Sequence, residues 1–299
     1  MKLSELAVTH HFVDLPGLRM HYVEKGVGPI VVLLHGFPEM WWSWRCQIDA
    51  LADAGFRVIV PDQRGYGETG KHGPYDLDTL AGDICHLIES LGAERRVKIV
   101  GHDWGGAVAW HLASLRPEHC DRVAVLNCPH PAVMRKALLS NLSWAQLKKS
   151  WYMFFFQLPL VPEYFLTRND AELMPRTLKG ASRDRAQWTE DDVRPFRDAI
   201  LRPGAASGML GWYRTAIRDG FSRPFSPPAY PPITTDALLL WGNADPALDF
   251  DILVPGTEAY APRLKIVPIE GSGHFVQSER PEEVNAELLR FLSTTTGTS

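Results

Sequence analysis

Two patterns of hydrophobic and polar residues follow each other along most of the 299-residue chain: short apolar runs, and longer segments with an apolar residue every three or four positions. Short apolar runs bounded by polar residues, glycine or proline predict eight β-strands. They are His10–Leu15, Leu18–Glu24, Ile30–Leu34, Arg57–Pro61, Val97–Val100, Arg122–Leu126, Asp236–Trp241 and Leu264–Ile269. Longer segments with an apolar residue every three or four positions predict helices between most of these strands. They are Trp44–Ala54, Leu77–Leu91, Trp104–Leu115 and Pro281–Leu292.

The order of these elements predicts the fold class. Strands that alternate with helices are typical of an α/β fold, here a mostly parallel eight-stranded sheet with helices on both faces. From Ile30–Leu34 onward the strands are short and apolar, as expected where both faces of the sheet are covered. Pro16-Gly17 joins the first two strands, so we expect an antiparallel hairpin at one edge.

The alternation stops between residues 131 and 232. This block is rich in aromatic residues, arginine and proline, and its periodicity is helical in Leu142–Leu158, Asp191–Gly204 and Ala206–Gly220. We expect residues 131–232 to form a helical cap, inserted into a core that comprises residues 1–130 and 233–299. Because small-molecule sites tend to lie between domains, the cap predicts a site beneath it.

The composition narrows the classes of function. With 45% hydrophobic and 22% charged residues, the chain is ordinary for a soluble globular protein. A net charge of -4 gives no support for nucleic acid or an anionic membrane surface as a partner. No apolar run approaches the ~20 residues of a membrane span, and the first residues lack the apolar core of a signal peptide. The 4 cysteines have no metal-ligand spacing, so we expect reduced thiols, no metal and a cytoplasmic protein.

The stretch from Gly101 to Gly105 has the spacing of a nucleophile elbow, G-x-nucleophile-x-G, between a predicted strand and a predicted helix. Its central residue is Asp103, where hydrolases of this kind commonly carry serine. Asp103 as a simple helix N-cap would explain the aspartate. It would not explain the flanking glycines, which a tight strand-to-helix turn needs.

Two later residues complete a predicted triad in the chain order nucleophile, acid, histidine. Asp245 follows the strand that ends in "LLLWG", and His274 lies in a Gly/Ser loop after the last strand. Asp249 is a weaker candidate for the acid. A single loop histidine is usually structural, but three matches in the expected order favour catalysis.

The loop after Ile30–Leu34, "HGFPE", predicts one half of an oxyanion hole. We assign its backbone N–H donors to Phe37 and to Trp104, the residue after the nucleophile, and expect both residues to contact substrate. His35 and His102 are expected to be structural, bonded to loop backbone. Phe37-Pro38 is a candidate cis peptide bond.

An aspartate nucleophile predicts the type of reaction. Attack of Asp103 on an sp³ carbon forms an ester, whose carbonyl water can then attack, whereas a serine would form a stable ether. His274 then serves as general base for that water, oriented by Asp245. The substrate therefore needs an electrophilic alkyl carbon with a leaving group. An acyl hydrolase would need a serine elbow, which neither Ser272 nor Ser278 occupies.

The segments "HGFPEMWWSWRCQIDALADAGFRVIVPDQRGYGETG" and "VGHDWGGAVAW" resemble the soluble epoxide hydrolases of the α/β-hydrolase fold, and the similarity extends over nearly the full length. The resemblance implies that fold, a small-molecule epoxide and water as substrates, a diol product and no cofactor. It also implies two cap tyrosines that bind the epoxide oxygen. "WYMFFFQLP" assigns the first to Tyr152 and "GWYRTAIRDG" the second to Tyr213. Tyr164 and Tyr230 are the fallback candidates, since Tyr152 also fits an aromatic core stripe of the cap.

Related functions on the same fold remain alternatives. Haloalkane dehalogenases share the elbow and a tryptophan at Trp104, but tend to carry asparagine where this chain has Phe37. Fluoroacetate dehalogenases, which act on a haloacid, place arginines after the nucleophile, where this chain has Trp104 and Ala107. A non-catalytic small-molecule receptor is a further alternative, because a fold alone does not fix function. A monomer and a homodimer both fit the sequence.

Overall fold

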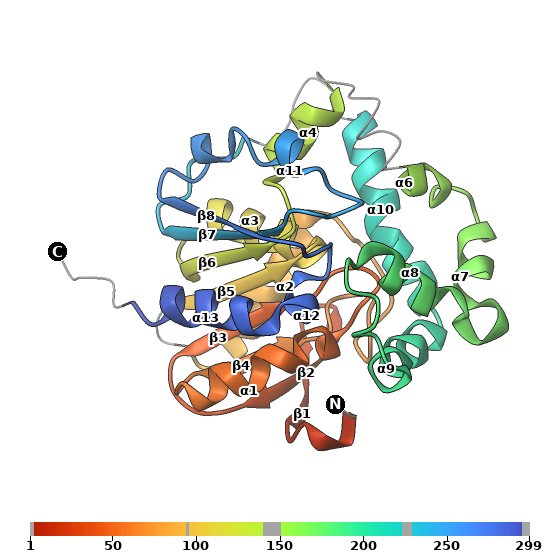
Figure 1. Ribbon diagram of the computed structural model, residues 1–299, viewed down its shortest axis with the longest axis horizontal. Coiled ribbons are helices and arrows are strands. Elements are labelled where there is room, and N and C mark those ends of the chain that lie inside the picture. Colours follow the sequence, from red (N-terminus) through yellow and green to blue (C-terminus); the bar gives the residue numbers. More distant parts are fainter. Residues whose placement is uncertain (1–2, 94–95, 140–150, 223–228, 295–299) are drawn as a thin grey trace.

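An eight-stranded sheet forms the centre of the computed structural model, with strand order β1-β2-β4-β3-β5-β6-β7-β8 (Figure 1). The structure describes residues 3–93, 96–139, 151–222 and 229–294. The strands are β1 (Thr9–Leu15), β2 (Leu18–Lys25), β3 (Ile30–Leu34), β4 (Arg57–Pro61), β5 (Val97–His102), β6 (Cys120–Leu126), β7 (Asp236–Gly242) and β8 (Leu264–Ile269). β1 and β2 form the predicted antiparallel edge hairpin, β2 pairs antiparallel with β4, and all other neighbours are parallel. The predicted α/β fold is therefore confirmed.

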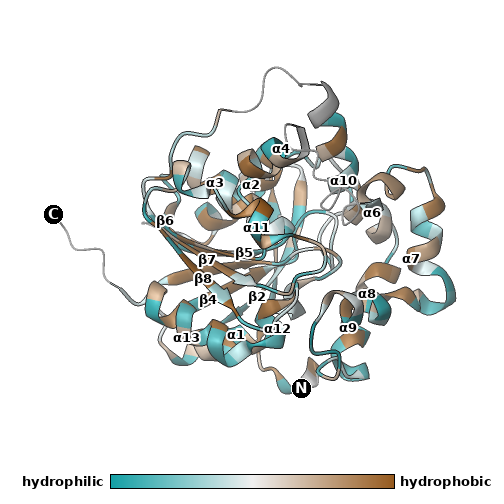
Figure 2. Cartoon of the chain, turned by 45° about the horizontal axis from the view of Figure 1, so that its top comes forward, coloured by the Kyte–Doolittle hydropathy of each residue, from teal (hydrophilic) through white to brown (hydrophobic). Residues whose placement is uncertain are grey.

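Helices cover both faces of this sheet (Figure 2). One layer contains α1 (Arg45–Asp53), α12 (Val276–Glu279) and α13 (Pro281–Leu292), which contact one another. The other contains α2 (Leu77–Ser90) and α3 (Trp104–Leu115), with the short α11 (Phe250–Leu253). Short 3-10 turns lie at η1 (Leu3–Glu5), η2 (Trp41–Trp44) and η3 (Thr257–Ala259). The strands are the most hydrophobic part of the picture, because both of their faces lie under helices.

The expectation that every strand from β3 onward is covered on both faces is wrong for β8. Of its six residues only Ile269 is buried, whereas every residue of β6 except Asp121 is buried. β8 is the last strand in the sheet order, so only one neighbour pairs with it. An apolar run therefore indicates a strand here but does not by itself indicate complete burial.

The described residues between β6 and β7 contain helices and no strand. The helices are α4 (Pro131–Leu139), α6 (Trp151–Phe155), α7 (Val161–Ala171), α8 (Leu173–Ala181), α9 (Glu190–Leu201) and α10 (Ala205–Ser222). The helices predicted in Asp191–Gly204 and Ala206–Gly220 are confirmed as α9 and α10, and α9 begins with a Thr189–Asp192 capping box. Most of the helix predicted in Leu142–Leu158 lies outside the described residues.

Several contacts fix the helical insert against the sheet domain. Arg45 of α1 forms a buried ion pair with Asp192 of α9, with 3.1 Å between Nε and Oδ1. The indole N–H of Trp212 in α10 donates to the carbonyl of Arg64 over 2.9 Å. The helices α6 to α10 therefore sit beside the edge of the sheet where the strands end (Figure 1).

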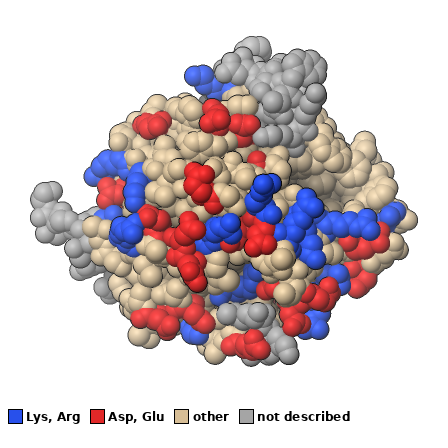
Figure 3. Space-filling model, viewed as in Figure 1, with Lys and Arg blue, Asp and Glu red and all other residues tan. Residues whose placement is uncertain are grey.

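The surface charges and the cysteine thiols add little to the functional interpretation. Basic and acidic side chains are intermixed on the face shown in Figure 3, without a large field of one sign. None of the described helices is long and apolar enough to cross a membrane. The cysteines at 46, 85, 120 and 128 are free thiols.

Candidate active site

The predicted elbow is present between β5 and α3. Asp103 adopts φ 50 and ψ -123, a backbone conformation that costs a non-glycine residue about 1–3 kcal/mol. Both flanking glycines are required by close backbone approach: a Cβ on Gly101 would lie 2.3 Å from the Gly105 carbonyl oxygen. A Cβ on Gly105 would lie 2.2 Å from the carbonyl oxygen of Leu34. The turn thus directs the Asp103 side chain outward from the carboxyl edge of the sheet.

The two oxygens of Asp103 face different groups. The backbone N–H of Phe37 donates to Oδ1 over 2.8 Å, and Oδ2 lies 3.6 Å from Nε2 of His274. Burial alone would raise the pKa of Asp103, but the bond and charge of His274, with the Phe37 N–H, lower it below its usual value. The side chain keeps 16% of its surface exposed. Asp103 is therefore an ionised carboxylate, with Oδ1 on the N–H of Phe37 and Oδ2 beside His274.

The second predicted donor of the oxyanion hole is the N–H of Trp104, at the first position of α3. Its bond to Asp103 stays a prediction. The indole ring of Trp104 packs edge-to-face on Tyr213, with the ring centroids 5.1 Å apart. Phe37 packs on the same tyrosine at 5.2 Å, and the Phe37-Pro38 bond is cis, as predicted.

The structure brings His274 and Asp245 together. Nδ1 of His274 lies 2.7 Å from Oδ2 of Asp245, whose other oxygen accepts the N–H groups of Ala247 and Leu248. Burial would lower the pKa of His274, but the carboxylates of Asp245 and Asp103 on either side raise it well above 6.5. Of the two candidate acids, Asp245 is bonded to His274, and Asp249 is the N-cap residue of α11.

Asn127 is a site residue that the sequence analysis missed. It directly follows β6 and has φ 42, in the left-handed region. Its side-chain amide donates to Oδ2 of Asp245 over 2.8 Å, and its Oδ1 accepts the N–H of Gly242 over 2.9 Å. The only sequence signal is its place at the end of a buried strand, beside the strand that leads to Asp245.

A buried polar network lies beneath His274 and includes Glu39, which the sequence analysis also missed. Nδ1 of His102 lies 3.0 Å from Oε2 of Glu39, and Nε2 of His102 lies 2.9 Å from the carbonyl oxygen of His274. Burial would raise the pKa of Glu39, but His102 lowers it. His35 contacts the carbonyl of Gly36 and accepts the N–H of Gln63. Both histidines are thus bonded to loop backbone, as predicted.

The two predicted tyrosines come together from α6 and α10. The ring centroids of Tyr152 and Tyr213 lie 5.9 Å apart, and Phe156 packs against both. Burial, reinforced by the negative charge of Asp103, raises the pKa of each hydroxyl above its usual value. The hydroxyls therefore stay protonated and available as donors.

The fallback tyrosines occupy other places. Tyr164 on α7 is 62% exposed. The hydroxyl of Tyr230 lies 2.9 Å from Nδ1 of His111, which in turn contacts Asp78. Neither tyrosine joins the group around Asp103.

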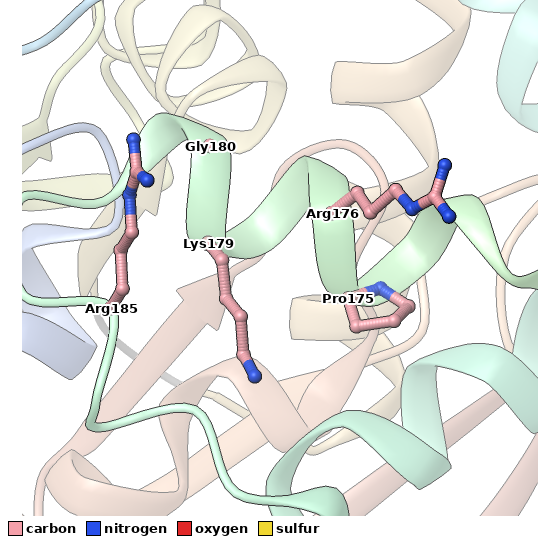
Figure 4. A pocket seen from close by; sticks show the side chains of 5 residues that line it. All are labelled: Pro175, Arg176, Lys179, Gly180 and Arg185. Carbon is pink, nitrogen blue, oxygen red and sulfur yellow. The ribbon is translucent and has the colours of Figure 1, made fainter.

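A separate hollow lies on the outer surface of α8. It is lined by Pro175, Arg176, Lys179, Gly180 and Arg185. In Figure 4 the three charged ends point in different directions and do not converge on one point. None of these side chains belongs to the group around Asp103. Within the described residues, no group of three or more His, Cys, Asp or Glu side chains could hold a metal ion.

Known proteins share this arrangement of sequence and fold. The family model of the alpha/beta hydrolase fold matches residues 29–156, which include the Phe37 loop and the elbow. The AB hydrolase superfamily protein YfhM of Bacillus subtilis is 40% identical over 94% of this chain and 96% of its own length. Epoxide hydrolase A of Mycobacterium tuberculosis is 34% identical over 96% of this chain and 98% of its own.

A solved structure extends the comparison to three dimensions. Epoxide hydrolase A from Mycobacterium thermoresistibile superposes with a TM-score of 0.81 at 32% identity, over 96% of this chain and 98% of that one. Matches of this length include the sheet domain and the helical insert together. The chain therefore belongs to the α/β-hydrolase family and is a homologue of its epoxide hydrolases.

Proposed function

We propose that the protein hydrolyses epoxides to vicinal diols through a covalent ester on Asp103. The observation that carries this proposal is the placement of Asp103. One oxygen accepts the N–H of Phe37, the other lies 3.6 Å from His274, and two protonated tyrosines lie nearby. The homologous epoxide hydrolases support the same substrate class.

Ring opening uses the carboxylate and the tyrosines. Oδ2 of Asp103 attacks an epoxide carbon, and the bond from that carbon to the epoxide oxygen breaks. Tyr152 and Tyr213 donate hydrogen bonds to the developing alkoxide, and one of them gives it a proton. Oδ1 stays on the N–H of Phe37 and becomes the carbonyl oxygen of the ester.

Esterification itself prepares His274 for the second step. Asp103 loses its charge on becoming an ester, which removes one of the groups that raise the pKa of His274. The proton on Nε2 returns to the tyrosinate, and Nε2 becomes a base. Asp245 remains bonded to Nδ1 and holds the ring in place.

Hydrolysis then regenerates the enzyme. His274 removes a proton from water, whose oxygen attacks Cγ of the ester, and the N–H of Phe37 stabilises the negative charge on Oδ1. As the tetrahedral intermediate collapses, the bond from Cγ to the alkyl oxygen breaks. The proton left on the intermediate passes to the departing oxygen, which yields the diol and an ionised Asp103.

The intact mass of His274→Gln after exposure to an aryl epoxide tests this proposal. We expect a gain equal to one epoxide, because alkylation needs no base and hydrolysis does. The gain should be absent when Asp103→Ala is added, and Asp103→Ala alone should lower turnover by at least about 10⁴-fold.

The other functions predict different results in the same assay. A haloalkane or haloacid dehalogenase would gain an alkyl group only from halogenated compounds. A receptor would bind compounds without a mass change. Normal steady-state turnover in His274→Gln would contradict the mechanism.

A further inference from the structure

In its described residues α6, the helix that carries Tyr152, buries little side-chain surface that could fix its position. Its described residues, Trp151–Phe155, include no fully buried side chain. Trp151 is 64% exposed and Phe154 is 51% exposed. Contacts with other elements therefore help to determine where Tyr152 lies.

Arg214 on α10 supplies such contacts to the segment that follows α6. Its Nε donates to the carbonyl of Phe156 over 2.9 Å, and Nη2 donates to the carbonyl of Leu158 over 2.8 Å. The same guanidinium forms a bidentate pair with Glu163 at the start of α7, at 2.6 and 3.0 Å. One side chain therefore binds the residue that follows α6, the connecting turn and α7. Only the planar fork of an arginine can make this set of bonds.

We call Arg214 and Glu163 together the clamp. Both side chains are largely shielded from solvent. The Arg214 side chain is 26% exposed and that of Glu163 is 15% exposed. Burial would raise the pKa of Glu163, but Arg214 lowers it, so the carboxylate is ionised. Ser207 of α10 also donates to Glu163, over 3.3 Å.

The position of Arg214 in the sequence joins the clamp to the candidate site. It directly follows Tyr213 on the continuous helix α10, so the backbone that carries one tyrosine also carries the clamp. Phe156, whose carbonyl accepts from Arg214, packs on Tyr213 with ring centroids 5.0 Å apart and on Tyr152 at 5.6 Å. The amide of Gln157 reaches the Tyr213 carbonyl over 3.5 Å.

From this geometry we infer that Arg214 and Glu163 are positioning residues that set the separation of the Tyr152 and Tyr213 hydroxyls. Loss of the clamp slows ring opening and leaves hydrolysis of the alkyl-enzyme unchanged, because His274 and Asp245 lie on the sheet domain. The inference rests on the proposed epoxide hydrolysis.

Single-turnover kinetics with an aryl epoxide test the inference in Arg214→Gln. We expect the rate of alkyl-enzyme formation to fall by about 10- to 100-fold, since a misplacement of about 1 Å can cost that much. The rate of its breakdown should match the wild type. Arg214→Lys keeps the charge without the fork and should restore only part of the rate.

A matched control and a double mutant separate positioning from general stability. Arg194→Gln removes an exposed ion pair with Asp191 on α9 and should leave both rates unchanged. In a Tyr152→Phe background, Arg214→Gln should cause little further loss, because the clamp acts through Tyr152. Glu163→Gln keeps the two carbonyl bonds and replaces Arg214→Gln if that variant does not fold.

Three results would overturn the inference while leaving the proposed function intact. They are wild-type alkylation in both clamp variants, an equal loss in both chemical steps, and full additivity with Tyr152→Phe. If the wild type forms no alkyl-enzyme with the epoxide, the proposed function fails instead.

Discussion

The two sides of the candidate site are constructed differently. Asp103, Asp245 and His274 each follow a strand of the sheet at its carboxyl edge, and the parallel pairing of those strands brings them together. Tyr152 and Tyr213 come from helices of the insert, and ring contacts with each other and with Phe156 bring them together. The core side is therefore placed by backbone hydrogen bonds and the cap side by side chains. Changes on the core side should remove a chemical step, and changes on the cap side should slow one.

The largest effect in this comparison is expected for the acid of the core side. Asp245→Asn should slow hydrolysis of the alkyl-enzyme by about 1,000-fold or more, because His274 loses the carboxylate that orients and stabilises its protonated ring. Rapid-mix measurement of alkyl-enzyme decay would check this. Asp249→Asn is the matched control and should decay at close to the wild-type rate. The opposite order for the two variants would assign the acid to Asp249.

A smaller effect is expected on the cap side. Tyr213→Phe should raise the barrier to ring opening by about 1–3 kcal/mol, through loss of one hydrogen bond to the developing alkoxide. The single-turnover rate of alkylation measures this change. Tyr164→Phe, at an exposed position of α7, is the control and should leave the rate unaffected. Equal rates for wild type and Tyr213→Phe would remove Tyr213 from the reaction.

The smallest effect concerns the negative charge of Asp103, which is lost in ring opening and thereby prepares His274 for ester hydrolysis. Asp103→Asn is neutral, as the ester is, so the pKa of His274 should be lower in this variant than in the wild type. Titration of the His274 ring by NMR measures the difference. An unchanged pKa would contradict the proposed role of Asp103 in controlling the base.

The same shift has a consequence for stability. The folded-state pKa of His274 lies above the 6.5 of a free histidine. Its protonation therefore stabilises the fold fully below about pH 6.5, and this contribution is lost as the pH rises through the folded-state pKa. The unfolding free energy of the wild type should fall more over that range than that of Asp103→Asn.

The sequence pattern predicted the sheet well, because the spacing of apolar residues depends only on which face of each strand or helix is covered. Five of the six strands predicted to be covered on both faces are largely buried, and β8, the last strand in the sheet order, is not. The domain boundaries at 131 and 232 stay predictions. α4, at the start of the predicted cap, packs against α3 and α11.

Site residues within a local sequence motif could be predicted, whereas those that act through contacts distant in the chain could not. Asp103 lies within a local motif whose glycines are needed by the turn itself. Asn127 and Glu39 have no such motif. They act on Asp245 and His102, which are far away in the chain, and only the folded sheet brings them into contact.

By itself the sequence determined the fold class and predicted the nucleophile and the order of the triad, because each is specified by local spacing and by the covering of strands. The tertiary structure decided which carboxylate bonds His274 and how α6, which has no fully buried side chain in its described residues, is fixed. It also decided that Arg214 reaches across to Glu163. These contacts join segments whose separation in the chain carries no information about their separation in space, so only packing of the whole molecule could specify them.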